Sequence, residues 1–353
     1  MTKITSKPFG TTTEGVPATL YTFTNKSGCE VSICSYGATI VSIKVPDRDG
    51  KFADVVLGYD DLEGYMSRHY FFGASIGRCG NRIGKGKFTL NGKEYQLNCN
   101  DGNNHLHGGN KGYESVVWKC DVKTSEQDDC LVLKHFSPDG DENYPGNLNV
   151  TLTYSFNDKN ELTLNYQAVS DADTICNLTN HSYFNLAGHD SGDILSQEAK
   201  IYANTFTEAD NESIPTGKTL KVEGTPMDFR EFHVVGERID SDYYQLIFAG
   251  GYDQNWVLDK ANKELGLCAE MYDQKSGRHM TCLTTNSCVQ FYCGNFIAGD
   301  QKGKNGFVYQ KRAGMCFETQ FAPDAVNQPS FESPILKAGE KYDYTTTYRF
   351  DLK

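Results

Sequence analysis

The chain has 353 residues, with 46 acidic and 34 basic side chains, so its formal net charge is −12 at pH 7. An acidic surface repels the phosphate backbone, so nucleic acids are not expected as partners. Hydrophobic residues make up 38% of the sequence, and no apolar run approaches the roughly 20 residues that cross a membrane, so we expect a soluble protein without a membrane partner.

The first fifteen residues are polar and rich in Thr, without the apolar stretch of a secretory signal, which predicts a cytoplasmic protein. The 12 cysteines are scattered through strand-like stretches and form no Cys-x-x-Cys pair. This pattern favours reduced, mostly buried thiols over a disulfide framework or a zinc ribbon. Glycine-rich motifs for dinucleotides or phosphates are absent as well, which leaves a cofactor-free enzyme or a binding module.

Alternation of apolar and polar residues, the pattern of strands with one buried face, dominates the chain. Residues 88–97 predict a hairpin, because the Asn-Gly pair at their centre suits a type I′ turn. Residues 150–156 and 162–166 predict a second antiparallel hairpin, and residues 342–352 predict a final strand. Many short strands without a long amphipathic helix, linker or repeat predict an all-β protein, a large antiparallel sandwich or barrel in one domain.

The first candidate site residues lie in the Gly-rich segment 77–86, which contains two arginines. Such a segment could bind phosphate, but only Lys85 and Lys87 add positive charge nearby, and no helix is expected to begin there. Arg82 and its neighbour Asn81 together supply several fixed donors and an acceptor. A neutral, polyhydroxylated ligand therefore fits equally well.

Two histidines, His105 and His107, stand two positions apart before a Gly-Gly pair, and an extended backbone would point both side chains the same way. His-x-His is also a spacing of metal ligands, and His181 or Glu318 could complete such a site, although spacing alone is weak support. The alternative is that both are turn histidines bonded to the backbone of a Gly-rich loop.

His181 lies in a segment where strand alternation sets it on one face with Asn177, Thr179 and Tyr183. A structural histidine more often stands alone on an apolar face, whereas this one shares its side with hydrogen-bonding groups, as in the wall of a polar cleft. From spacing alone, the functional and structural interpretations are evenly balanced.

Two acidic residues are further candidates. Glu318 lies in the largely apolar stretch 314–321, where alternation sets it on one face with Cys316 and Gln320. It is either a surface charge on an edge strand or a partly buried acid, and burial would raise its pKa and make it a stronger base at neutral pH. Asp253 follows a Gly-rich turn, where an ordinary turn aspartate is the simpler interpretation.

Several short motifs occur in a fixed order over nearly the whole chain, from about residue 9 to residue 350. They are Gly77-Arg78 with Asn81-Arg82-Ile83, Leu106-His107-Gly108-Gly109, Tyr144-Pro145-Gly146-Asn147-Leu148, Asn180-His181-Ser182-Tyr183-Phe184-Asn185-Leu186, Ile214-Pro215-Thr216-Gly217, Gly251-Tyr252-Asp253, Gln290-Phe291-Tyr292 with Gly294-Asn295-Phe296, Glu318-Thr319-Gln320 and Asn327-Gln328-Pro329. Each is short, but together they are specific, and with them the chain resembles the aldose 1-epimerase family.

This resemblance implies an all-β fold, a single large antiparallel β-sandwich of the galactose mutarotase-like type over residues 1–353, with a sugar in an open cleft. It implies that Glu318 is the general base, His181 the general acid and His107 a second active-site histidine. It assigns sugar contacts to four further residues, Arg82, Asp253, Gln290 and Asn81, and no role to His105. It implies no metal and no cofactor, and a free aldohexose such as galactose or glucose as the small-molecule substrate. No obligate protein partner is evident from the sequence.

The implied reaction explains the residue types. Interconverting α and β anomers requires a base to take the proton of the anomeric hydroxyl and an acid to protonate the ring oxygen, so that the ring opens to the aldehyde. After rotation about the bond next to the aldehyde, the ring closes on the other carbonyl face with the two groups exchanging roles. Neither step needs a cofactor.

Three other functions are weighed against this one. A glycoside hydrolase could use Asp253 and Glu318 as its carboxylate pair, at a separation that sequence does not give. A hexose-6-phosphate epimerase would need a compact basic pocket, which the few nearby arginines disfavour. A non-catalytic sugar-binding protein on the same fold would have lost the base or the acid, and both are present.

Overall fold

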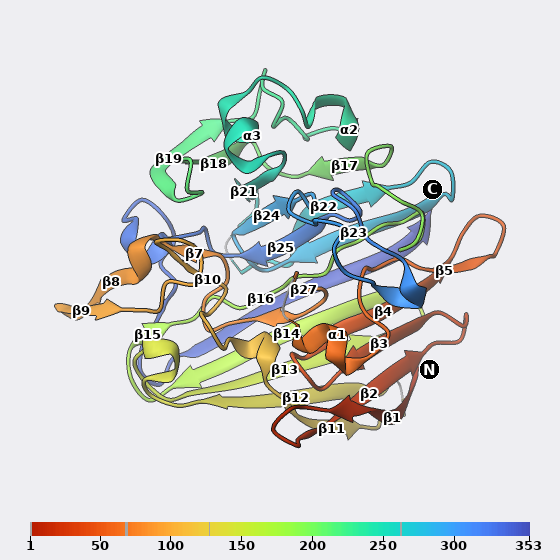
Figure 1. Cartoon of the computed structure of the whole chain (residues 1–353), viewed down its shortest axis with the longest axis horizontal. Coiled ribbons are helices and arrows are strands. Elements are labelled where there is room, and N and C mark those ends of the chain that lie inside the picture. Colours follow the sequence, from red (N-terminus) through yellow and green to blue (C-terminus); the bar gives the residue numbers. More distant parts are fainter. Residues whose placement is uncertain (1, 68–69, 127, 262) are drawn as a thin grey trace.

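The computed structural model describes residues 2–67, 70–126, 128–261 and 263–353. The strand pairs of its sheets run antiparallel, and three sheets dominate the architecture (Figure 1). The prediction of an antiparallel all-β fold is confirmed. None of the helices in the described residues is long and apolar enough to cross a membrane.

The largest sheet has nine strands in the order β11-β12-β13-β14-β27-β23-β22-β17-β20. Their bounds are β11 Lys119–Lys123, β12 Cys130–Ser137, β13 Leu148–Phe156, β14 Glu161–Ser170, β27 Lys341–Leu352, β23 Arg278–Thr284, β22 Gly266–Tyr272, β17 Glu198–Ile201 and β20 His233–Val234. The predicted hairpin of β13 and β14 and the predicted last strand, β27, lie side by side at its centre. The chain end thus sits in the middle of the sheet.

Two five-stranded sheets complete the main framework. The N-terminal sheet has the order β1-β2-β3-β4-β5, and the other sheet, called here the site sheet, has the order β19-β18-β21-β24-β25. Their bounds are β1 Lys3–Thr11, β2 Pro17–Thr24, β3 Glu30–Cys34, β4 Thr39–Pro46, β5 Phe52–Asp54, β18 Thr205–Ala209, β19 Pro215–Lys221, β21 Asp253–Val257, β24 Cys288–Tyr292 and β25 Cys316–Gln320.

Shorter elements connect the sheets. The two-stranded pairs are β7 Arg82–Ile83 with β10 His105–Leu106, β6 Ser75–Ile76 with β16 Thr179–Asn180, β8 Lys87–Leu90 with β9 Lys93–Gln96, and β15 Thr174–Ile175 with β26 Ile335–Leu336. The α-helices are α1 Leu62–Met66, α2 Val235–Arg238 and α3 Tyr244–Ala249, and the 3₁₀ turns are η1 Gly84–Gly86, η2 Tyr113–Ser115, η3 Asp141–Asn143, η4 Lys304–Gly306 and η5 Ala325–Asn327. In the β8–β9 hairpin, Asn91 and Gly92 both have positive φ, at 53° and 77°, as the predicted type I′ turn requires.

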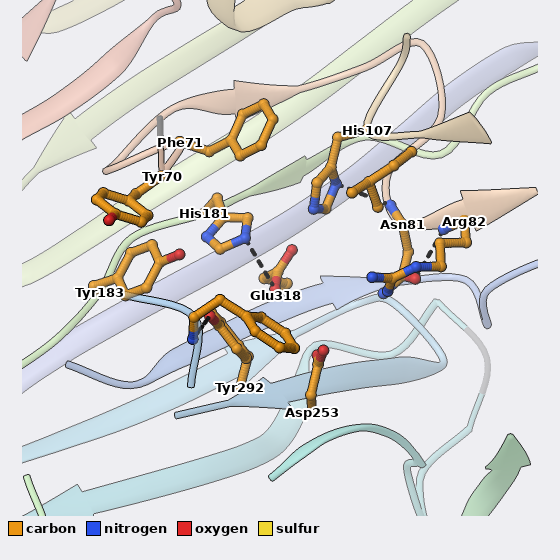
Figure 2. A pocket seen from close by; sticks show the side chains of 12 residues that line it. Tyr70, Phe71, Asn81, Arg82, His107, His181, Tyr183, Asp253, Tyr292 and Glu318 are labelled. Carbon is orange, nitrogen blue, oxygen red and sulfur yellow. Dashed lines mark hydrogen bonds and ion pairs between the residues drawn. The ribbon is translucent and has the colours of Figure 1, made fainter. Parts of the chain in front are cut away.

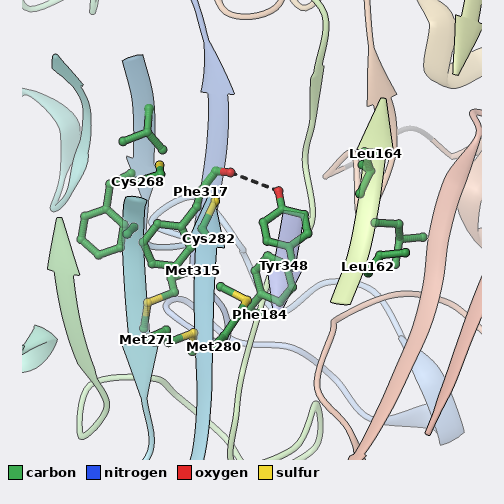
Figure 3. Close-up of a cluster of buried hydrophobic side chains, with 14 of the residues drawn as sticks. Leu162, Leu164, Phe184, Cys268, Met271, Met280, Cys282, Met315, Phe317 and Tyr348 are labelled. Atoms are coloured by element: carbon green, nitrogen blue, oxygen red, sulfur yellow. Dashed lines mark hydrogen bonds between the residues drawn. The ribbon is translucent and has the colours of Figure 1, made fainter. Parts of the chain in front are cut away.

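One buried cluster of apolar side chains joins the three sheets. It contains Val31 from β3, Leu152 from β13 and Phe317 from β25, each at most 1% exposed. The nine-stranded sheet is thus covered by both five-stranded sheets, which makes a sandwich. Figure 3 shows the part under β25, where the Tyr348 hydroxyl of β27 donates a hydrogen bond to the backbone carbonyl of Phe317.

The cysteines contribute to this core. All twelve are free thiols, and nine of them are buried. The expectation of mostly buried cysteines is confirmed, and the buried thiols act as small apolar side chains in the strands.

Candidate active site

A cavity of about 140 Å³ lies where the site sheet meets the segments around β7, β10 and β16 (Figure 2). Its lining combines carboxylates, imidazoles, a guanidinium and aromatic rings, and consists of Tyr70, Phe71, Asn81, Arg82, Leu106, His107, His181, Tyr183, Asp253, Tyr292, Phe296 and Glu318. Six of the seven site residues expected from the sequence line this one cavity. The exception is Gln290.

Glu318 rises from the middle of β25, a strand whose residues are all buried. Phe317 stacks on Phe291 in the core, so strand alternation turns Glu318 toward the cavity. Its side chain is only 3% exposed, and within the described residues its Oε2 atom has no hydrogen-bond partner. Burial, reinforced by the negative charge of Asp253 and opposed by Arg82, raises the pKa of Glu318 well above its ordinary value.

His181 follows β16 and faces Glu318, with Nε2 of the imidazole 3.6 Å from Oε1 of the carboxylate. Its backbone N–H donates to the Ala74 carbonyl, and its own carbonyl accepts from the Gly73 N–H, so the backbone is held on both sides. The ring lies between Phe71 and Tyr183, tilted by only 24° and 23° from the two aromatic planes. Burial lowers the pKa of His181 to about 4, so the free imidazole is neutral at pH 7.

His107 stands on the other wall of the cavity and is fixed by Asn81. The Asn81 backbone N–H donates to Nδ1 of His107 at 3.1 Å, and the His107 N–H donates to the Asn81 carbonyl. Burial, with smaller contributions from His181 and Arg82, lowers the pKa of His107 well below its ordinary value. Since Nδ1 accepts a hydrogen bond, the neutral ring carries its proton on Nε2 and can donate it to a ligand.

This tautomer bears on the metal hypothesis. Ligand atoms of His107, His181 and Glu318 lie within 4.8 Å of one another, a spacing that could hold a metal ion. A metal binds the unprotonated nitrogen of a neutral imidazole, and for His107 the only nitrogen left to bind it is the Nε2 that carries the proton. The hydrogen bond from Asn81 thus disfavours a metal here and favours a hydrogen-bonded organic ligand.

Asn81 and Arg82 present polar groups at the edge of the cavity. Arg82 Nε donates to Oδ2 of Asp101 at 2.7 Å, which fixes the guanidinium, and its backbone N–H donates to the Asn81 side-chain carbonyl at 2.8 Å. Asn81 has a positive φ of 60°, a conformation that Asn tolerates better than most residues. The guanidinium of Arg82 thus lines the cavity in an orientation held by its ion pair with Asp101.

Asp253 begins β21 and points into the cavity from below in Figure 2. Gln290, from the neighbouring strand β24, donates from Nε2 to Oδ1 of Asp253 at 2.7 Å. Desolvation raises the pKa of Asp253, while Arg82 and the Gln290 hydrogen bond lower it. Gln290 thus holds Asp253 through this hydrogen bond and is not part of the cavity lining.

Two details of the sequence-based expectation are wrong. His105 and His107 do not point the same way, because His107 has a positive φ of 50° where an extended backbone was expected. His105 is fully buried elsewhere, with Nδ1 on the Asn98 carbonyl and Nε2 accepting from the Tyr144 hydroxyl at 2.6 Å. Asn177 bonds to backbone carbonyls and, like Thr179, is absent from the cavity lining, so the polar face around His181 is only partly a cleft wall.

Several aromatic residues of the cavity are missing from the sequence-based site. Phe71 lies 6.0 Å from the ring of His181 and 5.1 Å from that of His107, and it also has a positive φ, at 57°. Phe296, 59% exposed, stacks on Tyr292 at the rim. The available signals were that Tyr183, Tyr292 and Phe296 belong to motifs quoted for the resemblance, and that alternation sets Tyr183 on one face with His181. Phe71 lies in no such motif and on no regular element.

The arrangement suits acid–base chemistry on a neutral polar ligand. The carboxyl of Glu318, whose pKa is raised, lies 3.6 Å from the imidazole of His181, whose pKa is lowered. Paired titratable groups with shifted pKa values are typical of acid and base catalysts. Arg82, Asn81 and Asp253 supply donors and acceptors around this pair, and the aromatic rings supply apolar contact surface.

Comparison with known proteins gives consistent matches over the whole fold. The family model of aldose 1-epimerase matches residues 19–349. The chain is 46% identical over 322 residues to galactose mutarotase of Bos taurus, covering 91% of each protein, and 43% identical over 352 residues to galactose mutarotase of Rattus norvegicus, covering 100% of each. It is 32% identical over 339 residues to aldose 1-epimerase of Escherichia coli, covering 96% of each.

Solved structures agree with these matches. The galactose 1-epimerase of Lactobacillus acidophilus superimposes with a TM-score of 0.87 at 26% identity, covering 100% of this chain and 99% of the other. An aldose epimerase homologue from C. elegans superimposes with a TM-score of 0.85, also at 26% identity, covering 99% of each chain.

Proposed function

The chain belongs to the aldose 1-epimerase family and interconverts the α and β anomers of aldoses, and we propose that Glu318 is the general base and His181 the general acid of this reaction. The observation that carries the proposal is the 3.6 Å approach of His181 Nε2 to Glu318 Oε1 inside the cavity. We propose galactose and glucose as substrates, because the relatives at 43–46% identity are named galactose mutarotases.

Ring opening moves two protons between the sugar and this pair. Glu318 takes the proton of the anomeric hydroxyl, the bond between the anomeric carbon and the ring oxygen breaks, and His181 gives its proton to the ring oxygen. The product is the open-chain aldehyde. Rotation of the aldehyde group and the reverse transfers then close the ring on the other face, so each turnover leaves the protein as it began.

The pKa shifts suit a pair that shares one proton. Burial raises the pKa of Glu318 and lowers that of His181 to about 4, so when the pair holds a single proton, burial favours its position on Glu318. Ring opening requires the form of the pair in which the proton is on His181. This form holds the same number of protons and is the less populated of the two. Once the ring is open, the proton is on Glu318, where burial favours it, and the aldehyde state is thereby stabilised.

The surrounding residues bind and orient the sugar. The Nε2–H of His107 can donate to the ring oxygen or a neighbouring hydroxyl as the ring opens. Arg82, Asn81 and Asp253 are proposed to bind sugar hydroxyls, and Gln290 to act through Asp253. Because these residues hold the sugar next to the acid and the base, the proton transfers occur within one complex and do not depend on collisions in solution.

Three further proposals concern the domain organisation, the protein partners and the location of the chain. We propose that residues 1–353 form one domain, because β27 at the chain end lies between β14 and β23. We propose that no protein partner is required, because the proposed acid, base and sugar contacts come from one chain. Free, mostly buried thiols favour a reducing compartment, which supports a cytoplasmic location.

The function is tested by polarimetry of freshly dissolved α-galactose and α-glucose in a weakly catalytic buffer. We expect the purified chain to accelerate the change in optical rotation, and Glu318→Gln to bring the rate back to background while galactose still binds. Binding is measured by calorimetry or ligand-observed NMR. Rapid mutarotation by Glu318→Gln would remove Glu318 from the role of base.

A further inference from the structure

A second cavity, of about 590 Å³, lies on the outer face of the N-terminal sheet and is called here the N-terminal groove. The other face of this sheet belongs to the core, because Phe23, Val31 and Ile43 are fully buried there. None of the described residues lines both the groove and the candidate active site. The volume of the groove is typical of small-molecule sites, and the proposed acid–base reaction makes no use of it.

A row of hydroxyl side chains runs along the groove. Four residues stand directly opposite one another on β1, β2, β3 and β4, which lie side by side in Figure 1, and all of them line the groove: Thr5, Thr22, Ser32 and Ser42. Neighbouring strands are about 4.8 Å apart, so the row is roughly 14 Å long. The hydroxyls of Thr22 and Ser32 lie 2.9 Å apart and share a hydrogen bond. The row thus offers donors and acceptors to a ligand that lies across the strands.

Ser42 distinguishes this row from an ordinary solvated face of a sheet. The residue is only 9% exposed, and its Oγ atom is buried without a hydrogen-bond partner in the described part of the chain. Burying a hydroxyl without a partner costs free energy, and buried polar groups nearly always have one. Because Ser42 also lines the groove, a ligand bound there is in position to supply this partner.

The end of the groove beside β5 contains two more buried polar side chains. Lys304, 5% exposed, donates from Nζ to Oδ2 of Asp54 at 2.7 Å and to the Val56 carbonyl at 2.8 Å, which leaves the third hydrogen of the ammonium for a ligand. His189, also 5% exposed, contacts the Tyr309 hydroxyl through Nδ1 at 3.1 Å, and its Nε2 has no hydrogen bond within the described residues. Both residues line the groove, so polar groups held by the fold converge at this end.

The charges that line the groove balance. They come from three lysines and three acidic residues, Lys7, Lys44, Lys304, Glu30, Asp54 and Asp60. Glu30 and Lys44 form an ion pair at 3.1 Å, so the groove favours neither an anion nor a cation. Phe9 and Tyr59 add aromatic surface, against which the C–H groups of a sugar ring can pack. Hydroxyls, balanced charge and aromatic rings together suit a neutral, polyhydroxylated ligand.

We propose that the N-terminal groove is a second carbohydrate-binding site, which binds a neutral oligosaccharide lying across β1 to β4. A row of four hydroxyls extends over more than one sugar ring, whereas the cavity of about 140 Å³ that contains Glu318 and His181 is proposed to take a single aldose. The inference does not rest on the proposed function, because neither Glu318 nor His181 lines the groove.

The test uses raffinose, a neutral trisaccharide without a free anomeric hydroxyl, which is therefore no substrate for mutarotation. Assigned backbone amide shifts of the ¹⁵N-labelled chain locate its binding, and their titration gives Kd. We expect shifts in β1 to β4 and around η4, and about tenfold weaker binding by the double variant Thr22→Val/Ser42→Ala, which removes two hydroxyls. Trigalacturonate, of similar length but negatively charged, is expected to bind no more tightly than raffinose. Should the double variant fold poorly, Ser42→Ala alone is expected to weaken raffinose binding by about threefold.

The matched control is Thr163→Val. Thr163 forms the same kind of cross-strand hydroxyl pair, 2.9 Å from Thr347, but on β14 and β27 and outside the groove. We expect this variant to bind raffinose as the unchanged chain does, and all variants to keep the mutarotation rate of the unchanged chain. Raffinose shifts confined to the candidate active site, unaltered binding by the double variant, or tighter binding of trigalacturonate would overturn the inference. Loss of mutarotation in the double variant would also overturn it, because the groove would then not be a separate site.

Discussion

His181 and Glu318 meet through Nε2 and Oε1 at 3.6 Å, both side chains no more than 5% exposed. Two such groups titrate together, and the properties of the site belong to the pair. Burial acts on them in opposite senses, because it penalises the charged form of each: the carboxyl keeps its proton to higher pH and the imidazole loses its proton at lower pH. Between these limits the pair holds one proton.

This coupling predicts a broad, bell-shaped dependence of kcat/KM on pH. Below about pH 4, the pKa of His181, the pair holds two protons and no base is present, so activity rises as the pH increases through this value. Above the raised pKa of Glu318 the last proton leaves and no acid remains, so activity falls. Polarimetric initial rates at low substrate, from pH 3.5 upward, measure both limbs. A lower limb at the ordinary pKa of His, about 6.5, in place of about 4 would contradict the assignment.

Replacing the acid tests its separate contribution. His181→Asn keeps a polar side chain of similar reach but removes the titrating ring, and we expect kcat to fall by about 10²–10⁴-fold with a much smaller change in affinity. Saturation kinetics with galactose separates the two parameters. An effect confined to KM would make His181 a binding residue.

Gln290 is expected to act on binding through Asp253. Gln290→Leu removes the hydrogen bond that holds Oδ1 of Asp253, so we expect KM to rise by about fivefold while kcat changes little. The matched control is the double variant with Asp253→Asn. If Gln290 works through Asp253, the two effects are not additive, whereas full additivity would give Gln290 a sugar contact of its own.

The fold is predictable from the sequence because the relevant signals are local. The hairpin turn at Asn91 needs two residues with positive φ, and an Asn-Gly pair supplies them at little cost. Glu318 was placed on the correct face of its strand by alternation alone, since Phe317 enters the core on the other side. What alternation did not reveal is that the strand is buried on both faces.

The errors arose where the backbone leaves regular structure. His107 turns through a positive φ, so the alternation that paired it with His105 does not apply. Phe71 has a positive φ as well and lies outside any strand, where no periodicity signals its position against His181. The sugar contact of Gln290 stays a prediction from the resemblance, and its hydrogen bond to Asp253 depends on the register of β21 and β24, which is a tertiary property.

The glycoside hydrolase alternative makes a distinct prediction. In the structure Asp253 accepts a hydrogen bond from Gln290, while Glu318 faces an imidazole. We therefore expect no release of nitrophenol from a nitrophenyl galactoside above background, with the same preparation active in mutarotation. Release that disappears in both Asp253→Asn and Glu318→Gln would show that the two carboxylates form a hydrolytic pair.

His105 is expected to stabilise the fold without taking part in catalysis. Its Nε2 accepts from the Tyr144 hydroxyl at 2.6 Å, and both side chains are at most 1% exposed. Tyr144→Phe keeps the ring but leaves the buried nitrogen without its donor, so we expect the free energy of unfolding to fall by about 1–3 kcal/mol. Urea unfolding measures this loss.

The control for this variant is Tyr95→Phe, because Tyr95 packs on Phe88 and its hydroxyl has no hydrogen bond in the described structure. We expect its stability to change by no more than about 0.5 kcal/mol. For Tyr144→Phe we expect kcat and KM to remain within about twofold of the unchanged chain, because His105 reaches the site only through the backbone of its short strand. A large drop in kcat with unchanged stability would mean that the His105–Tyr144 contact sets the geometry of His107, and that the separation of structural and catalytic histidines drawn from the structure is wrong.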